Sequence, residues 1–191
     1  MMAGEWPKEA ESLLGDLLPP FSQADKQILK GSADLLAFNY YRPHLIGPRS
    51  PSSPSVAIES TFSYQEMEDP WERISGVSSW LRLAPWGLGR FLRAIRRQYG
   101  DIPILISENG CADLKEGETL RDEHRTRYIR EHLVAIGEAR AEGIRWDDGF
   151  AVRFGLFQVD FSSSERTRVA KDSSLFYSQY IRDHPMGPYP R

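Results

Sequence analysis

Two short apolar and aromatic runs do most to limit how this chain can fold. One extends from Leu35 to Tyr41 and the other from Ile102 to Ile106. Continuous runs of this length are typical of strands that are buried on both faces, as in parallel sheets. Parallel strands need crossover connections, and a helical pattern lies between the two runs. The sequence therefore predicts an α/β fold built with right-handed crossovers.

Most of the remaining predicted structure is helical. From Leu88 to Tyr99 apolar residues recur at three- and four-residue spacing with arginines on the other side, which indicates an amphipathic helix. Asp122 suits the N-cap of a longer helix, and Gly143 suits its carboxyl-terminal end. The predicted helices cover residues 22–30, with Ser22 as the cap, 88–99, 122–143 and 173–183. Residues 153–161 are predicted to be extended, and the proline- and serine-rich residues 47–70 to form a long loop.

The charge and hydropathy of the chain argue against several kinds of partner. The 191 residues carry a net charge of -3, so they offer no basic excess for nucleic acid. No apolar run approaches the roughly 20 residues that span a bilayer, and we expect no membrane segment. The first residues lack the pattern of a signal peptide, which predicts a cytoplasmic location for the chain as written and leaves that of a longer parent protein open. No sequence feature identifies a protein partner.

Cysteine and histidine are too few and too scattered to predict a metal site. The single cysteine, Cys111, has no partner for an internal disulfide, and His124 and His132 are not at metal-binding spacing. Cys111 could act as a nucleophile, but no histidine is arranged to activate it. We therefore favour a free thiol near the rim of a cleft.

Polar residues follow both predicted strands at the point where each strand ends. The first run ends in Asn39 and Tyr41, and the second is followed by Ser107, Glu108 and Asn109. Ligands in parallel α/β folds bind at the carboxyl ends of the strands. A carboxylate cannot lie unpaired in a sheet core, so we expect Glu108 to face a polar cleft in which a tyrosine hydroxyl donates to it. Taken singly, a helix-capping or surface glutamate and a packed Asn-Tyr-Tyr run remain the alternatives.

Five motifs in a fixed order resemble the carboxyl-terminal half of a family 1 glycoside hydrolase, the group of β-glucosidases, lactases and klotho proteins. Together they span nearly the whole chain. They are Gly31-Ser32-Ala33-Asp34-Leu35-Leu36-Ala37-Phe38-Asn39-Tyr40-Tyr41; Trp80-Leu81 with Pro85-Trp86-Gly87-Leu88; Ile106-Ser107-Glu108-Asn109-Gly110; Tyr128 with His132-Leu133; and Arg153-Phe154-Gly155-Leu156 with Val159-Asp160.

The resemblance implies a fold, a reaction and a set of site residues. The fold is a (β/α)8 TIM barrel, and the reaction is retaining hydrolysis of β-glycosides or oligosaccharides without a metal or organic cofactor. Glu108 matches the catalytic nucleophile. Tyr41 matches the residue that contacts this nucleophile, and Asn39 matches a residue beside the sugar.

The chain also departs from the family pattern. Retaining hydrolysis needs a second carboxylate, which the family takes from an Asn-Glu-Pro motif, and these 191 residues contain no such motif. The eighth strand, with its sugar-binding motif, has no counterpart after Gly143. Trp146 matches the tryptophan of that motif, or else it is a tryptophan packed at a loop. A complete barrel needs roughly 250 residues, so residues 1–191 are predicted to be a single incomplete barrel domain that lacks the eighth strand.

Three hypotheses for the chain follow. It is a fragment of a retaining β-glycosidase with Glu108 as nucleophile, inactive because the acid/base glutamate is absent. Alternatively, it is a non-catalytic, klotho-like fragment that binds carbohydrate or protein. In the third hypothesis the product does not persist, because unpaired strand edges lead to aggregation.

Overall fold

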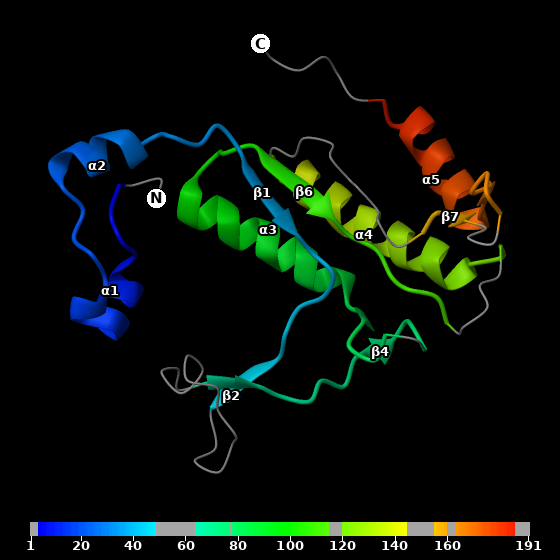
Figure 1. Ribbon diagram of the computed structural model, residues 1–191, viewed down its shortest axis with the longest axis horizontal. Helices are drawn as coiled ribbons and strands as arrows, with labels where there is room; N and C mark the ends of the chain where they lie inside the picture. The colour runs from blue at the N-terminus through cyan, green and yellow to red at the C-terminus, as the bar shows by residue number, and fades with distance from the viewer. Residues whose placement is uncertain are drawn as a thin grey trace. The chain divides into compact units, whose positions relative to one another are not determined.

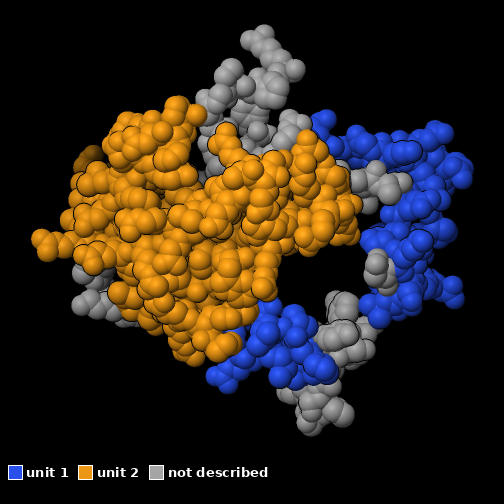
Figure 2. All heavy atoms as spheres, turned by 180° about the vertical axis from the view of Figure 1, so that it is seen from behind, with its two compact units in different colours: residues 1–36, 44–69 blue, residues 37–43, 70–191 orange. Residues whose placement is uncertain are grey.

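The chain divides into two units of different content. A computed structural model describes residues 4–48, 64–76, 78–114, 120–144, 155–159 and 163–185. One unit comprises residues 1–36 and 44–69, and the other comprises residues 37–43 and 70–191 (Figure 2). The predicted site residues Asn39, Tyr41 and Glu108 all belong to the second unit.

The first unit is built from short elements. Its helices are α1 (Lys8–Leu14), the 3-10 helix η1 (Gly15–Leu17) and α2 (Gln23–Leu29). Ser22 caps α2 as predicted, because its hydroxyl accepts from the Asp25 amide while the Asp25 carboxylate accepts from the Ser22 amide. Strands β2 (Ile46–Pro48) and β3 (Tyr64–Glu66) pair antiparallel. The long loop predicted over residues 47–70 therefore has strand structure at both ends, and residues 49–63 lie outside the described part.

The second unit holds a two-stranded sheet and the longer helices. Strands β1 (Leu36–Asn39) and β6 (Ile104–Glu108) are hydrogen-bonded neighbours and run in the same direction (Figure 1). The three predicted helices are confirmed as α3 (Pro85–Tyr99), α4 (Glu123–Ala141) and α5 (Asp172–Asp183). Two short antiparallel pairs also form: β4 (Glu72–Arg73) with β5 (Arg82–Leu83), and β7 (Phe157–Val159), in the segment predicted to be extended, with β8 (Arg168–Ala170).

The β1–β6 sheet is well covered on one face only. Ile104 and Ile106 of β6 are buried, and Phe38 of β1 packs edge-on against Phe91 of α3 with 4.8 Å between ring centroids. In contrast, Ala37 and Asn39 of β1 are exposed. The prediction of strands buried on both faces is therefore wrong for the described residues. The described residues form two-stranded sheets and no closed barrel.

Helix α3 approaches the end of β1 closely because residue 87 is a glycine. A Cβ atom at Gly87 would lie 2.6 Å from Tyr40 Oη and 2.8 Å from Pro43 Cγ, which is closer than atoms pack. Pro85 at the first turn of α3 has no amide that would need a partner there. No helix among the described residues has the length and apolar character needed to cross a membrane.

A buried ionic cluster joins the loop after β6 to the start of α4 and α5. The Arg125 guanidinium donates to Asp122, to Asp113 and to the Cys111 carbonyl, while Lys171 donates to Asp113 over 3.4 Å. Arg125, Asp122 and Lys171 have almost no exposed side-chain surface. Charges buried to this degree need charged partners, and here each has at least one.

Asp122 takes the N-cap position of α4 as predicted, but its side chain does not cap that helix. Its carboxylate accepts hydrogen bonds from the amide and hydroxyl of Ser173 in α5 and from Arg125. Burial opposes the charged form of Arg125, yet hydrogen bonds to Asp113 and Asp122 raise the pKa of its guanidinium. A tertiary contact has thus replaced the local cap that the sequence suggested.

Candidate functional site

Glu108 lies at the carboxyl end of β6 and is hydrogen-bonded to the residue that the sequence paired with it. The Tyr41 hydroxyl donates to Glu108 Oε2 over 2.6 Å. The Tyr40 amide donates to the Glu108 carbonyl over 2.8 Å, which holds the ends of β1 and β6 together. A short hydrogen bond to a charged oxygen is stronger than one between neutral groups, so it orients the carboxylate.

Asn39 lies beside this pair on the exposed side of the sheet. The Ser107 hydroxyl donates to Asn39 Oδ1 over 2.7 Å, so the two strand ends are joined by side chains as well as by backbone. Three of the four predicted site residues, Asn39, Tyr41 and Glu108, thus come from neighbouring strand ends. The fourth, Trp146, lies outside the described residues, and its role stays a prediction.

An exposed tryptophan lies next to Tyr41. The Trp80 ring meets the Tyr41 ring edge-on with 5.6 Å between centroids, and 44% of Trp80 is exposed. Aromatic rings beside a few polar groups are typical linings of ligand pockets. Trp80 belongs to one of the five family motifs, but it is not among the predicted site residues. Its signal was a large aromatic residue on no predicted helix or strand.

Buried polar residues form hydrogen bonds to the backbone of the site residues. Asn109 Nδ2 donates to the Tyr40 carbonyl over 2.7 Å and to the Tyr128 hydroxyl over 3.2 Å. The Tyr128 hydroxyl in turn donates to the Tyr41 carbonyl. The sequence predicts Tyr128 on the apolar stripe of a helix, which does not show this role of its hydroxyl. The signal available was the phenol itself, since a buried tyrosine hydroxyl needs a partner.

His132 packs against Tyr128 and is buried in its neutral form. The two rings stack with 4.1 Å between centroids, and His132 Nδ1 lies 2.8 Å from the Tyr128 carbonyl. Burial lowers the pKa of His132 to about 4. The unfolded chain therefore binds a proton at a pH where the folded chain does not.

This difference predicts a pH-dependent loss of stability. The contribution of neutral His132 to the free energy of unfolding is fully present above about pH 6.5. As the pH falls towards 4, up to about 3 kcal/mol of it is lost. Urea unfolding of the unaltered chain and of His132→Phe at several pH values measures it. The difference in unfolding free energy between the two should change through this window. A constant difference would contradict a buried neutral histidine.

Cys111 is a buried thiol. It has no exposed surface, and burial raises its pKa to about 12. The prediction of a thiol near a cleft rim is therefore wrong. The loop after β6 turns Cys111 inward, where its carbonyl accepts from Arg125. A thiolate nucleophile is equally disfavoured, because at neutral pH the thiol form dominates.

We expect Cys111 to resist thiol reagents while the chain is folded. At pH 8, a disulfide reagent such as dithiobis(nitrobenzoate) should react at least about 10²-fold more slowly with the native chain than with the chain in urea, because the buried thiol is both protonated and inaccessible. The absorbance of released thionitrobenzoate measures both rates. Similar rates would show that the loop after β6 opens readily.

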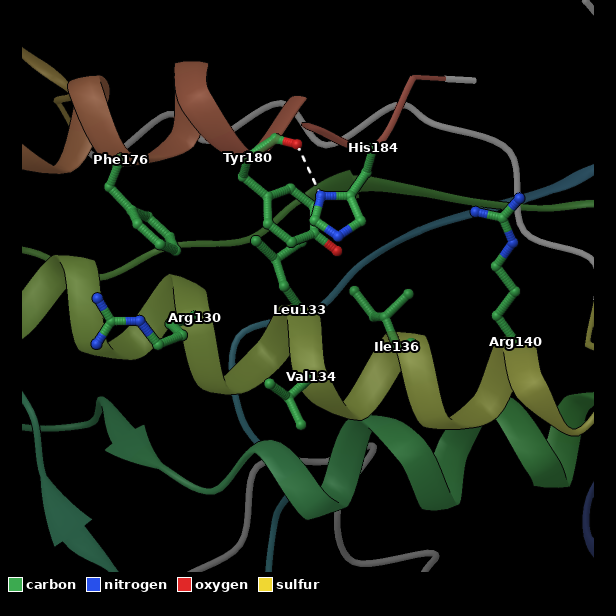
Figure 3. Close-up of a pocket in the computed structure, with 9 residues that line it drawn as sticks. Arg130, Leu133, Val134, Ile136, Arg140, Phe176, Tyr180 and His184 are labelled. Carbon is green, nitrogen blue, oxygen red and sulfur yellow. Dashed lines mark hydrogen bonds between the residues drawn. The ribbon is translucent and has the colours of Figure 1, made fainter. Parts of the chain in front are cut away.

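A hollow of about 440 Å³ between α4 and α5 is separate from this site (Figure 3). Its lining is apolar and basic and includes no carboxylate. The lining residues are Arg130, Leu133, Val134, Ile136, Gly137, Arg140, Phe176, Tyr180 and His184. The hollow therefore has no group for attack on a glycosidic carbon. Among the described residues, no three His, Cys, Asp or Glu side chains gather to hold a metal.

The chain is similar to several curated glycosidases. It is 30% identical over 204 residues to oleuropein β-glucosidase of Olea europaea, an alignment that covers 95% of this chain and 37% of that protein. It is 30% identical to lactase/phlorizin hydrolase of Homo sapiens over 93% of this chain and 10% of the relative. The chain thus spans less than half the length of these relatives.

Several solved structures that it resembles are β-glucosidases. The β-glucosidase of Trichoderma harzianum matches with a TM-score of 0.79 and 26% identity, covering 95% of this chain and 43% of that one. β-Glucosidase 2 of Trichoderma reesei, in complex with Tris, matches with a TM-score of 0.80 and 25% identity over 98% and 45% of the two chains. Residues 1–186 match the sequence profile of glycosyl hydrolase family 1, which confirms the resemblance of the five motifs. The chain belongs to glycosyl hydrolase family 1.

Proposed function

We propose that this chain is the nucleophile-bearing part of a retaining β-glycosidase, with Glu108 as the nucleophile. The hydrogen bond between Tyr41 and Glu108 at the ends of two parallel strands is the observation that carries the proposal. It sets an oriented carboxylate at the sheet end where ligands bind in α/β folds. β-Glucosidases among the relatives support a β-glycoside as the substrate.

The proposed chemistry begins with Glu108. Its carboxylate attacks the anomeric carbon, the bond to the leaving oxygen breaks, and a covalent glycosyl ester forms. Tyr41 keeps the attacking group in place, and Asn39 lies where it can hydrogen-bond a sugar hydroxyl. Trp146 completes the proposed sugar contacts on the strength of the resemblance. In a retaining site that holds the second carboxylate, water then hydrolyses the ester and releases the sugar with its original configuration.

The 191 residues lack the Asn-Glu-Pro motif from which the family takes the second carboxylate of the retaining pair. Neither asparagine of the chain, Asn39 or Asn109, is followed by Glu-Pro. The leaving oxygen therefore departs without a proton donor, and the hydrolytic water has no base. Losing this assistance costs about 10²–10⁴ in rate. We propose that residues 1–191 form part of one (β/α)8 barrel domain without its eighth strand. On its own, this part should show negligible turnover of β-glycosides.

A substrate with an activated leaving group tests this proposal. Dinitrophenolate leaves without protonation, so 2,4-dinitrophenyl β-D-glucoside bypasses the missing acid. We expect a slow release of dinitrophenolate that approaches one equivalent per chain and then nearly stops, because the ester lacks a base for hydrolysis. An unactivated alkyl β-glucoside should release nothing. Sustained turnover of the alkyl glucoside would overturn the proposed inactivity, and no release from either substrate would overturn the role of Glu108.

A further inference from the structure

We propose that Tyr128, together with Asn109, is a positioning residue that holds the Tyr41 hydroxyl within hydrogen-bond distance of Glu108. Its catalytic meaning rests on the proposed function, but the contacts themselves do not. Tyr128 lies in α4, well away from Glu108 in the sequence, and is fully buried. Helix α4 thus controls the orientation of the Glu108 carboxylate through the Tyr128 hydroxyl.

The path from Tyr128 to the carboxylate passes through a single residue. The Tyr128 hydroxyl donates to the carbonyl of Tyr41, and the side chain of that same Tyr41 donates to Glu108 Oε2 over 2.6 Å. Fixing the carbonyl fixes the peptide unit from which the Tyr41 side chain extends. Residue 41 lies just beyond the end of β1, where the β1–β6 ladder no longer holds the backbone. The hydrogen bond from Tyr128 to the Tyr41 carbonyl therefore keeps the Tyr41 phenol within hydrogen-bond distance of Glu108.

Asn109 joins the three elements that meet here. It directly follows Glu108, is fully buried, and donates to both the Tyr40 carbonyl and the Tyr128 hydroxyl. The end of β1, the end of β6 and helix α4 are thus tied by one amide and one phenol. Since the Tyr128 hydroxyl accepts from Asn109, its own proton is directed to the Tyr41 carbonyl.

The Tyr128 ring is itself held rigidly. His132, one turn further along α4, stacks on it and lies within hydrogen-bond distance of the Tyr128 carbonyl. A tyrosine that only filled the core would need a partner for its hydroxyl as well. It would change stability when altered, but not the environment of Glu108. The two roles therefore predict different measurements.

Carbon-13 NMR of the full chain, labelled at glutamate side-chain carboxyls, separates the two roles. The Glu108 signal is identified by its loss in Glu108→Gln. Tyr41→Phe removes the hydrogen bond outright and defines the full shift of that signal. We expect Tyr128→Phe to move the signal in the same direction by at least a third of that shift, and Asn109→Ser to do likewise. If Tyr128→Phe does not fold, Asn109→Ser alone decides.

Two controls match these variants. Tyr99→Phe makes the same chemical change at an exposed tyrosine of α3, and it should leave the signal in place. Leu133→Ala truncates another buried side chain of α4, so it should lower stability without moving the signal. A Glu108 signal that stays in place in both folded site variants, or that moves equally in Leu133→Ala, would overturn the proposal.

The same variants keep this inference distinct from the proposed function. If both hold, dinitrophenolate release by Tyr128→Phe should slow roughly 10- to 10²-fold, as for other small displacements of a reacting group. If the signal moves while even the unaltered chain releases nothing, the positioning role stands and the proposed function fails. Release at an unchanged rate by Tyr128→Phe would overturn the positioning role alone.

Discussion

Replacing Arg125 with alanine should lower the free energy of unfolding by about 3–5 kcal/mol. The guanidinium is buried and donates to Asp122 and Asp113, and only 1% of the Asp122 side chain is exposed. Removing it leaves the Asp122 carboxylate buried without its cationic partner. The three elements that meet at the cluster, the loop after β6, α4 and α5, should loosen together. Urea denaturation followed by circular dichroism measures the loss.

Arg127 on the same helix provides a matched control. It also binds two carboxylates, those of Glu72 and Glu131, but 48% of its side chain is exposed. Exposed pairs contribute only about 0–1 kcal/mol, so Arg127→Ala should have a small effect. Equal losses for the two variants would show that burial does not determine the strength of the Arg125 cluster.

The second large effect concerns Glu108. Changing this residue to glutamine keeps its size and removes the negative charge that attacks the anomeric carbon. Release of dinitrophenolate from the activated glucoside should therefore fall to the uncatalysed rate. Glu131→Gln makes the same chemical change at a half-buried residue of α4 whose carboxylate pairs with Arg127, and it should retain the release of the unaltered chain. A similar fall in both variants would point to a general loss of structure rather than of a nucleophile.

Elements with a strong local pattern could be predicted from the sequence. The helix over 88–99 follows from its apolar spacing and its Gly100 end, and the structure has α3 at Pro85–Tyr99, which begins three residues earlier than predicted. Gly143 adopts a positive φ of 83° just after α4, as its place at the end of that helix predicted. The juxtaposition of Tyr41 and Glu108 could also be predicted, because parallel neighbouring strands bring their carboxyl ends to one edge.

Features that depend on tertiary partners could not be predicted. Ala37 and Asn39 are exposed, and an apolar run does not report whether a second layer covers a sheet. Asp122 was expected to cap α4, but its carboxylate instead accepts a hydrogen bond from the amide of Ser173, which is far along the chain. Cys111 was expected near a rim, yet the loop turns it inward. In each case the deciding contact is distant in sequence.

Mass spectrometry of the covalent adduct tests the central claim most directly. The chain is incubated with 2,4-dinitrophenyl β-D-glucoside, denatured in acid and digested, and the peptides are sequenced by fragmentation. A glucosyl group should be found on the peptide that contains Glu108, attached to that side chain, and should be absent from Glu108→Gln. An unmodified Glu108 peptide, or a glucosyl group attached to a different residue, would contradict the assignment of Glu108 as the nucleophile.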